Sequence, residues 1–367
     1  MGCNNLLDPT TTTPKATWNG YSILGTCTEG SYKKNFLATK EGNYYMISCL
    51  PDDEDSRKEL EIMLKITGIY CLTDKTRVQH LINLVDYFII KRDALLQIGG
   101  ATFHPKLDGL DDLLSSHSGY VPTTERQRRF SMQSQPSRRQ SAPSVFLSSF
   151  GDTKKTTLVR PDYLCLVTNY YRNGTVDVYL KTIETSKFSQ EFLKIGHQLI
   201  HAVECFSNLP KMGYYHNDIK PQNILIDNEC NVKLSDFGIS ESINFTSTRV
   251  QPKNLHPYSD PFILKMGYKV TEQTEIYSYG LTLLELWTIY QTELSTKLSE
   301  FFSLELGEES RSEILIEIIE SISNDRIKKL ITHCCLNRNF DFRNIKDYLM
   351  SQEAGQKYKI GINYKKV

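Results

Sequence analysis

The chain has 367 residues, of which 40% are hydrophobic, so it is long enough to bury two substantial cores and form an enzyme-sized body. Lysine plus arginine equals aspartate plus glutamate at 43 each, so no global charge draws the chain to nucleic acid or to an acidic membrane. The nine cysteines show neither disulfide-type nor zinc-type spacing, which predicts an intracellular, cytoplasmic protein.

The first segment, residues 1–16, is rich in threonine and contains Pro14, a composition that predicts a flexible lead-in. It carries Gly2 and Cys3, which would allow myristoylation beside palmitoylation, although Leu6 stands where the acylation motif has Ser or Thr. An unmodified tail is the alternative. No run of eighteen apolar residues occurs, so we expect membrane association only if these two residues are acylated.

Short strands and one helix are predicted next. From Trp18 to about Leu50, alternating segments separated by turn residues such as Gly42-Asn43 predict an antiparallel meander. Residues 53–66 change to helical spacing behind an acidic first turn, which favours a helix because it complements the helix dipole.

A long polar stretch, roughly residues 105–157, has almost no apolar periodicity and predicts a disordered insertion. Within it, Ser131 and Ser141 each follow two arginines by two and three residues, a pattern that resembles the sites of basophilic kinases. Pro143 makes the second site also resemble ligands of phosphoserine-reading adaptors. A solvated, mildly basic linker is the alternative.

After the insertion the pattern becomes mostly helical. The apolar run from Leu164 to Val167 predicts a buried strand, and helical spacing predicts helices near 189–208, 272–289, 312–323, 326–336 and 341–350. Strands before and helices after predict an α+β protein with two lobes.

The strongest motif is His-Asn-Asp-Ile-Lys-Pro-Gln-Asn-Ile-Leu at residues 216–225, followed thirteen residues after Asn223 by Asp236-Phe237-Gly238. These segments resemble the catalytic loop and the start of the activation segment of eukaryotic protein kinases, in the form typical of serine/threonine kinases. The resemblance implies that Asp218 orients the attacking hydroxyl and accepts its proton, while Lys220 balances charge on the phosphoryl group. It also implies ATP as substrate and Mg²⁺ held by Asn223 and Asp236.

The resemblance extends from about Tyr21 to Leu349 outside the insertion. It implies a two-lobed kinase fold: an N-lobe of a five-stranded antiparallel sheet and one helix (17–170), a mostly helical C-lobe (171–349), and a C-terminal tail (350–367). It makes Glu59 the helix glutamate that pairs with a lysine on the third strand. The remaining positions implied to contact nucleotide are Gly25, Gly30, Ser48, the gatekeeper Thr168, the hinge residue Tyr170, and Leu225.

The phosphate-binding lysine of this family is missing. Ser48 occupies its position, and no lysine occurs from residue 41 to residue 57, so Glu59 lacks its usual partner. The protein kinases named for lacking this lysine show that a neighbouring strand can supply it. Lys33 and Lys34 are the only nearby candidates, and the sequence pattern does not choose between them.

Other departures concern the nucleotide pocket. Cys27 replaces the second glycine of the glycine-rich loop, and Glu29 adds a negative charge near the expected phosphates. Tyr32 and Met46 stand where smaller residues cover the adenine base, so we expect a smaller adenine pocket. The alternative is that Met46 bends aside and Tyr32 points away.

Three further departures affect regulation and anchoring. Asn217 replaces the arginine that in many kinases binds an activation-loop phosphate. Asp260-Pro261-Phe262 stands where Ala-Pro-Glu is usual, so we expect Arg343, the late C-lobe arginine, to be solvated or re-paired. Glu275 replaces an aspartate at a packed anchor.

Two functions fit this sequence. The first is a pseudokinase that acts as a scaffold or allosteric regulator in signalling and binds ATP weakly or not at all. The alternative is an active serine/threonine protein kinase that transfers the γ-phosphate of ATP to protein hydroxyls with a substitute lysine; ATP and Mg²⁺ are cofactors only in this case. Expected partners are a protein substrate or a partner kinase, and a phosphoserine-reading adaptor at Ser141. No nucleic-acid partner is expected.

Overall fold

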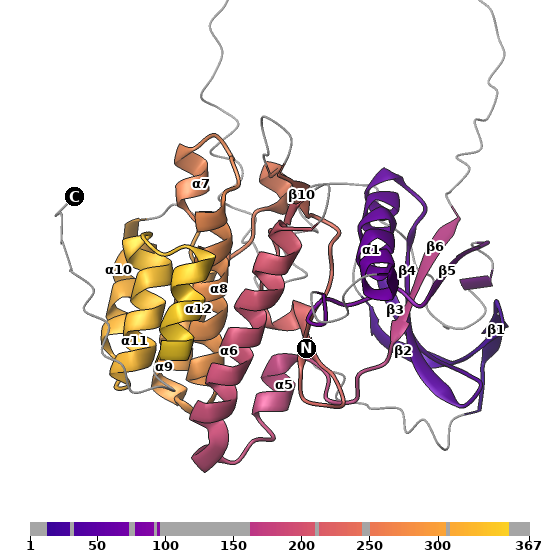
Figure 1. Ribbon diagram of the computed structural model, residues 1–367, viewed down its shortest axis with the longest axis horizontal. Coiled ribbons are helices and arrows are strands. Elements are labelled where there is room, and N and C mark those ends of the chain that lie inside the picture. The colour runs from indigo at the N-terminus through magenta and orange to yellow at the C-terminus, as the bar shows by residue number, and fades with distance from the viewer. Residues whose placement is uncertain are drawn as a thin grey trace, which may run out of the picture.

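The computed structural model describes residues 13–29, 33–72, 78–91, 94–95, 162–209, 213–243, 250–305 and 309–351. Figure 1 shows two lobes: a curled sheet with helix α1 (Glu54–Leu72) against it, and a body of helices beside them. The predicted α+β fold with two lobes is therefore confirmed. Gly2, Cys3, Gly30, Tyr32, Ser131 and Ser141 lie outside the described residues, as does the stretch 105–157.

The N-lobe sheet has six antiparallel strands, one more than predicted. In spatial order they are β1 (Ala16–Trp18), β2 (Tyr21–Glu29), β3 (Lys34–Lys40), β4 (Asn43–Pro51), β6 (Tyr163–Asn169) and β5 (Asp86–Ile90). The additional strand is β1, which begins before Trp18, where we expected structure to start. It forms because Asn19 and Gly20, with φ of 46° and 81°, make a two-residue hairpin turn, and because the buried Trp18 ring packs edge-on against Phe36.

Helix α1 starts where predicted and continues six residues past the predicted end at 66. Its N-terminus is capped by Asp53, whose Oδ1 accepts the Ser56 N–H at 2.9 Å. Ile62, Met63 and Ile66 are buried in the core cluster that extends into the C-lobe. This packing orients the helix so that Glu59 faces the space between the lobes.

The C-lobe is built on α6 (Thr185–Ser207) and α8 (Glu272–Trp287), which contact each other and each bury eight apolar residues, more than any other helix that the structure describes. Three helices were not predicted: those at Val176–Leu180, Phe262–Lys265 and Thr292–Ser303. The other helices are α5 (Val176–Leu180), α7 (Phe262–Lys265), α9 (Thr292–Ser303), α10 (Glu309–Glu320), α11 (Asp325–Thr332) and α12 (Phe342–Ser351), with a π-helical turn at His333–Asn337. Two small sheets pair β7 (Tyr214–Tyr215) with β10 (Glu241–Ser242), and β8 (Ile224–Ile226) with β9 (Val232–Leu234).

One apolar core joins the two lobes. Met63 of α1 and Leu84 share a buried cluster with Phe237 and the C-lobe helices. The ring of Phe237 lies 4.9 Å from Phe206 and 5.5 Å from His216, measured between ring centroids. The catalytic-loop sequence is thus fixed against α1 by packing.

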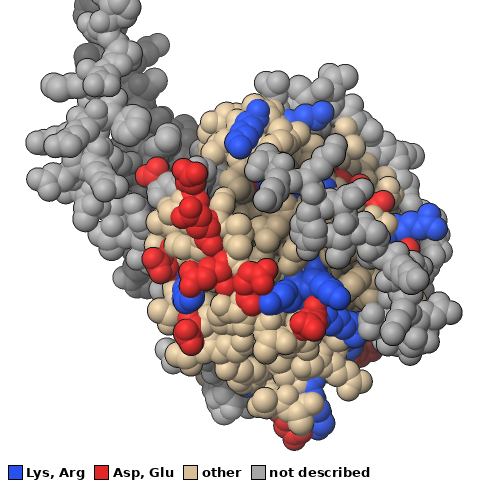
Figure 2. All heavy atoms as spheres, turned by 90° about the vertical axis from the view of Figure 1, so that its left-hand side faces the viewer, with Lys and Arg blue, Asp and Glu red and all other residues tan. Residues whose placement is uncertain are grey.

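The surface carries mixed charge. Figure 2 shows the face of the C-lobe end, where acidic side chains gather on one side and basic side chains lie next to them, so that neither sign covers the face. This fits the equal numbers of acidic and basic residues in the chain. Among the described residues, no helix combines the length and hydropathy needed to cross a membrane.

Candidate nucleotide and phosphotransfer site

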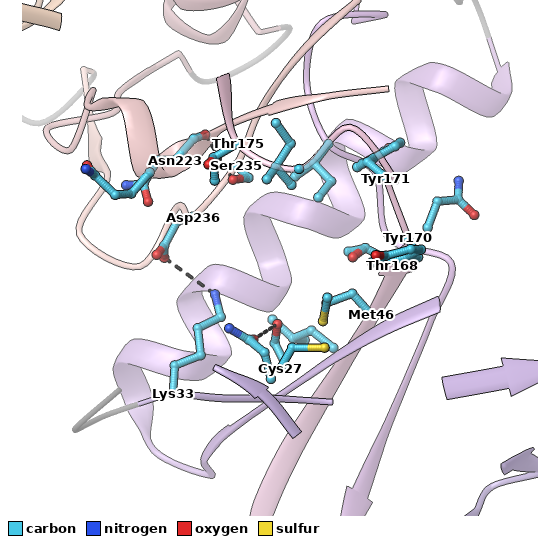
Figure 3. A pocket seen from close by; sticks show the side chains of 18 of the residues that line it. Cys27, Lys33, Met46, Thr168, Tyr170, Tyr171, Thr175, Asn223, Ser235 and Asp236 are labelled. Carbon is cyan, nitrogen blue, oxygen red and sulfur yellow. Dashed lines mark hydrogen bonds and ion pairs between the residues drawn. The ribbon is translucent and has the colours of Figure 1, made fainter. Parts of the chain in front are cut away.

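A cavity of about 430 Å³ lies between the lobes, within the size range of small-molecule sites (Figure 3). Its walls come from β3, β4 and α1 on one side, from the end of β6, and from the loops near Asn223 and Asp236 on the other. Most residues that the sequence predicts to contact nucleotide or metal line it. These are Ser48, Glu59, Thr168, Tyr170, Asn223, Leu225 and Asp236.

Lys33 enters this cavity immediately before β3. Its Nζ lies 3.0 Å from Oε1 of Glu59 and 3.5 Å from Oδ1 of Asp236, so it joins α1 to the Asp-Phe-Gly segment. Figure 3 shows the contact with Asp236. The Lys33 side chain is 23% exposed and Glu59 only 3%. Of the two candidate lysines, Lys33 is therefore the one that pairs with Glu59.

Lys34 lies on the other face of the sheet, because successive strand residues point to opposite faces. It is buried, and its Nζ lies 5.7 Å from the ring centroid of Phe36, which belongs to the outer apolar cluster of the N-lobe.

The charge of Lys33 follows from its surroundings. Burial alone would lower the pKa of Lys33, but Asp236 and Glu59 together raise it above the ordinary lysine value. The Lys33 ammonium is thus charged at neutral pH.

Ser48, which we expected at the position of the phosphate-binding lysine, forms a hydrogen bond within the sheet. Its Oγ donates a 2.6 Å hydrogen bond to Oδ1 of Asn35, its cross-strand neighbour on β3. Both side chains line the cavity. Lys33 is two residues before Asn35 and therefore projects to the same face, which explains how a neighbouring strand delivers a cation to this site.

The catalytic-loop residues form a compact network beside the cavity. The Nζ of Lys220 is 2.8 Å from the carboxylate of Asp218, and Nδ2 of Asn223 donates to Oδ2 of Asp218 at 2.8 Å. Burial acts to raise the pKa of Asp218, but Lys220 and His256 outweigh it and lower that pKa to about 2. Asp218 is therefore an ionised acceptor suited to orienting a hydroxyl group.

Asn223 and Asp236 fit a magnesium ion by the chemistry of their donors. Both line the cavity, and carboxylate and amide oxygens are the ligands that Mg²⁺ prefers. Asn223 uses its amide nitrogen toward Asp218, which leaves its carbonyl oxygen available to a cation. Asp236 adopts a left-handed φ of 69°, an uncommon conformation that places its carboxylate at the cavity wall.

The glycine-rich segment is only partly described. Gly25 lies within β2 and is not among the residues that line the cavity, whereas Cys27 is. Met46 also lines the cavity, opposite Thr168 on β6, and about 430 Å³ stays open with it in place. Met46 therefore forms part of the cavity wall, and the smaller adenine pocket, which also depends on Tyr32 outside the described residues, stays a prediction.

Comparison with known proteins decides the family. A model of the protein kinase domain family matches residues 151–349, more than half of the chain. The chain belongs to the protein kinase domain family. The matched region of this kinase domain begins shortly before β6 and includes the catalytic loop, while Lys33 and Ser48 lie upstream of it.

Several plant receptor-like kinases resemble this kinase domain. The calmodulin-binding receptor-like cytoplasmic kinase 1 of Arabidopsis thaliana is 30% identical over 132 residues, which are 35% of this chain and 28% of that protein. The probable LRR receptor-like serine/threonine-protein kinase RPK1 of the same plant is 36% identical over 126 residues, 33% of this chain and 23% of that protein. In both cases the match spans less than a third of the relative's length.

The kinase domain holds its catalytic loop in place through Glu275 of α8. This glutamate accepts the backbone N–H of His216 at 2.7 Å and of Asn217 at 2.9 Å, so the longer carboxylate still makes both contacts. Burial raises the pKa of Glu275 to about 7 although both hydrogen bonds oppose the shift.

His256 is a contact that sequence reasoning missed, since a lone histidine carries no motif. Its Nδ1 accepts the N–H of Tyr258 at 3.3 Å, which places the proton on Nε2. Nε2 then donates to the carbonyl oxygen of Asn217 at 2.7 Å and lies 3.4 Å from Oδ1 of Asp218. The loop before α7 is thereby tied to the catalytic loop at the residue that replaces the phosphate-binding arginine.

At the start of α7, Asp260 forms an ion pair with an arginine other than Arg343. Arg338 binds both carboxylate oxygens of Asp260, one at 2.6 Å, and its guanidinium lies 4.8 Å from the ring centroid of Phe262. Arg343, the arginine identified from the sequence, has a side chain that is 83% exposed, and its Nε lies 4.0 Å from Oδ2 of Asp347. This side chain is therefore solvated. The C-lobe pairing thus persists through Arg338, five residues earlier.

Proposed function

We propose that this kinase domain is an active serine/threonine protein kinase: it binds Mg²⁺–ATP between its lobes and transfers the γ-phosphate to protein hydroxyls. The observation that carries this proposal is the contact of the Lys33 ammonium with both Glu59 and Asp236. A cation at this point supplies the charge-assisted contact to the phosphates that the loss of lysine at position 48 removes.

We assign a residue to each part of phosphoryl transfer. Asp218 is ionised and accepts the hydrogen bond of the attacking hydroxyl, and Lys220 beside it offsets negative charge on the phosphoryl group. Asn223 and Asp236 would hold Mg²⁺, which supplies charge neutralisation between the phosphates. Lys33 orients the phosphates, and Glu59 keeps the Lys33 side chain in the cavity.

The substrate class rests on the catalytic loop and on the relatives. The Lys-Pro-Gln-Asn form of residues 220–223 is similar to serine/threonine kinases, and RPK1 is named as one. We therefore extend this class to the chain as part of the proposal.

A scaffold role is the second candidate, and Cys27 favours it. This side chain lines the cavity where a glycine would let the backbone approach the phosphates. A pseudokinase that uses the two-lobed fold only to bind a partner kinase would tolerate such a change.

Two measurements separate these functions. Mg²⁺–ATP should raise the melting temperature of the full chain, because a ligand that binds only the folded state stabilises it. Radiolabel transfer to a mixed protein substrate should then occur with the parent and vanish with Asp218→Asn. Nucleotide stabilisation without transfer above the Asp218→Asn background would support the scaffold function, and absence of both would refute nucleotide-dependent kinase activity.

A further inference from the structure

An apolar surface lies on the N-lobe between α1 and the edge strand β5. Val85, just before this strand, and Tyr87 and Ile89 within it are 43%, 48% and 54% exposed, and Leu64 of α1 is 43% exposed. These are four of the ten large apolar side chains that the described part of the chain exposes. We call this set, Leu64, Val85, Tyr87 and Ile89, the α1/β5 surface.

The four residues belong to one patch. Thr67 of α1 exchanges hydrogen bonds with the backbone of Leu84, at 2.9 Å from its N–H and 3.4 Å to its carbonyl oxygen, so this part of the helix lies beside the start of β5. Leu64 is one turn before Thr67 on the same face of the helix. Tyr87 and Ile89 are cross-strand neighbours of the buried Leu166 and Leu164, which pack in the same cluster as α1.

We propose that residues 144–150 of this chain, Ser-Val-Phe-Leu-Ser-Ser-Phe, pack on the α1/β5 surface. Within residues 105–157 this run is the most apolar one without charge. Four of its seven side chains are apolar, and exposed apolar patches of this kind mark interaction sites.

The connectivity places this run near the surface. The chain leaves the sheet just after β5 and returns at Asp162, where the N–H of Asp52 donates to the Asp162 carbonyl at 2.9 Å, next to the start of α1. Eleven residues lie between Phe150 and Asp162, a reach of up to about 40 Å when extended. The tether gives an effective concentration of roughly millimolar, so weak packing is enough.

Its lack of charge distinguishes this run from the other apolar run of the insertion. The other run, residues 107–114, contains three aspartates. Packing these carboxylates on an apolar surface would cost free energy because they would lose contact with water. Residues 144–150 carry no such cost, since their polar members are serines.

A double-mutant cycle on the full chain tests this packing. The segment variant carries Val145→Ser, Phe146→Ser and Leu147→Ser; the surface variant carries Tyr87→Thr and Ile89→Thr, because threonine keeps strand propensity. We expect the segment variant to lower the melting temperature by a few degrees in the parent and by nothing further in the surface variant. The matched control, Leu110→Ser with Leu113→Ser and Leu114→Ser, should leave it unchanged.

Amide hydrogen exchange supplies a second readout that needs only the segment variant. Exchange in residues 60–68 and 84–90 should quicken several-fold relative to the parent and to the control. Additive melting shifts in the cycle, or unchanged exchange, would overturn the proposal. A melting temperature that depends on protein concentration, lost in the surface variant, would instead assign the surface to a second copy of the chain.

Discussion

Lys33 and Glu59 form the ion pair that joins the sheet to helix α1, with 3.0 Å between Nζ and Oε1. The lysine comes from the residue before β3. The family pattern places it on the predicted third strand, which is β4 in the structure. The pair keeps the geometry that matters, which is a cation in the cavity held by a buried glutamate. A lysine on the neighbouring strand therefore still brings a positive charge into the cavity.

Lys33→Met is expected to weaken Mg²⁺–ATP binding by about 10- to 100-fold, the usual worth of a charge-assisted hydrogen bond. Lys34→Met is the matched control, because that side chain lies on the outer face of the sheet and should leave nucleotide affinity unchanged. Fluorescent-nucleotide titration measures both. Equal loss in the two variants would show that Lys33 has no special role.

Restoring the family pattern should rescue the first variant. In the double variant Lys33→Met, Ser48→Lys, a lysine on β4 faces the same cavity and replaces the missing ammonium. We expect nucleotide affinity to recover to within about tenfold of the parent, less than fully because Asn35 loses its hydrogen bond with Ser48. Binding as weak as in Lys33→Met alone would mean that the two positions are not interchangeable.

Residues that belong to a sequence motif were easier to predict than contacts made by residues outside any motif. Asp218, Lys220 and Asn223 were predictable because local spacing sets their geometry. Arg338 and His256 were not, since their partners Asp260 and Asn217 lie 78 and 39 residues away in the sequence and a single arginine or histidine carries no signal. The choice of Lys33 over Lys34 required the strand register, because adjacent residues point to opposite faces.

Strand β1 and the cavity wall at Met46 show two further limits of prediction from the sequence. Three residues of β1 are too few for periodicity, and the hairpin that holds them depends on the Asn19-Gly20 turn, which was not predicted. The volume beside Met46 depends on its rotamer and on backbone placement, neither of which residue size alone determines.

Arg338→Ala should destabilise the C-lobe by about 3–5 kcal/mol, because it leaves the fully buried Asp260 carboxylate without its cation. Arg343→Ala should leave the stability unchanged, since that side chain is 83% exposed. Urea unfolding of the two variants gives the comparison. A larger loss in Arg343→Ala would restore the assignment made from the sequence.

The raised pKa of Glu275 leads us to expect that the stability of the chain changes with pH in a definite direction. Its pKa is about 7 in the folded chain and 4.5 in the unfolded reference, so the folded state holds more protons between these values. Its contribution therefore falls as pH rises from about 4.5 to 7, by roughly 3 kcal/mol at most. Glu275→Gln does not titrate, so the parent's stability relative to this variant should fall across that window in urea unfolding at pH 5 and 7.5. The exposed Glu313→Gln should follow the parent at both pH values, and a Glu275→Gln variant that did the same would show that Glu275 ionises normally.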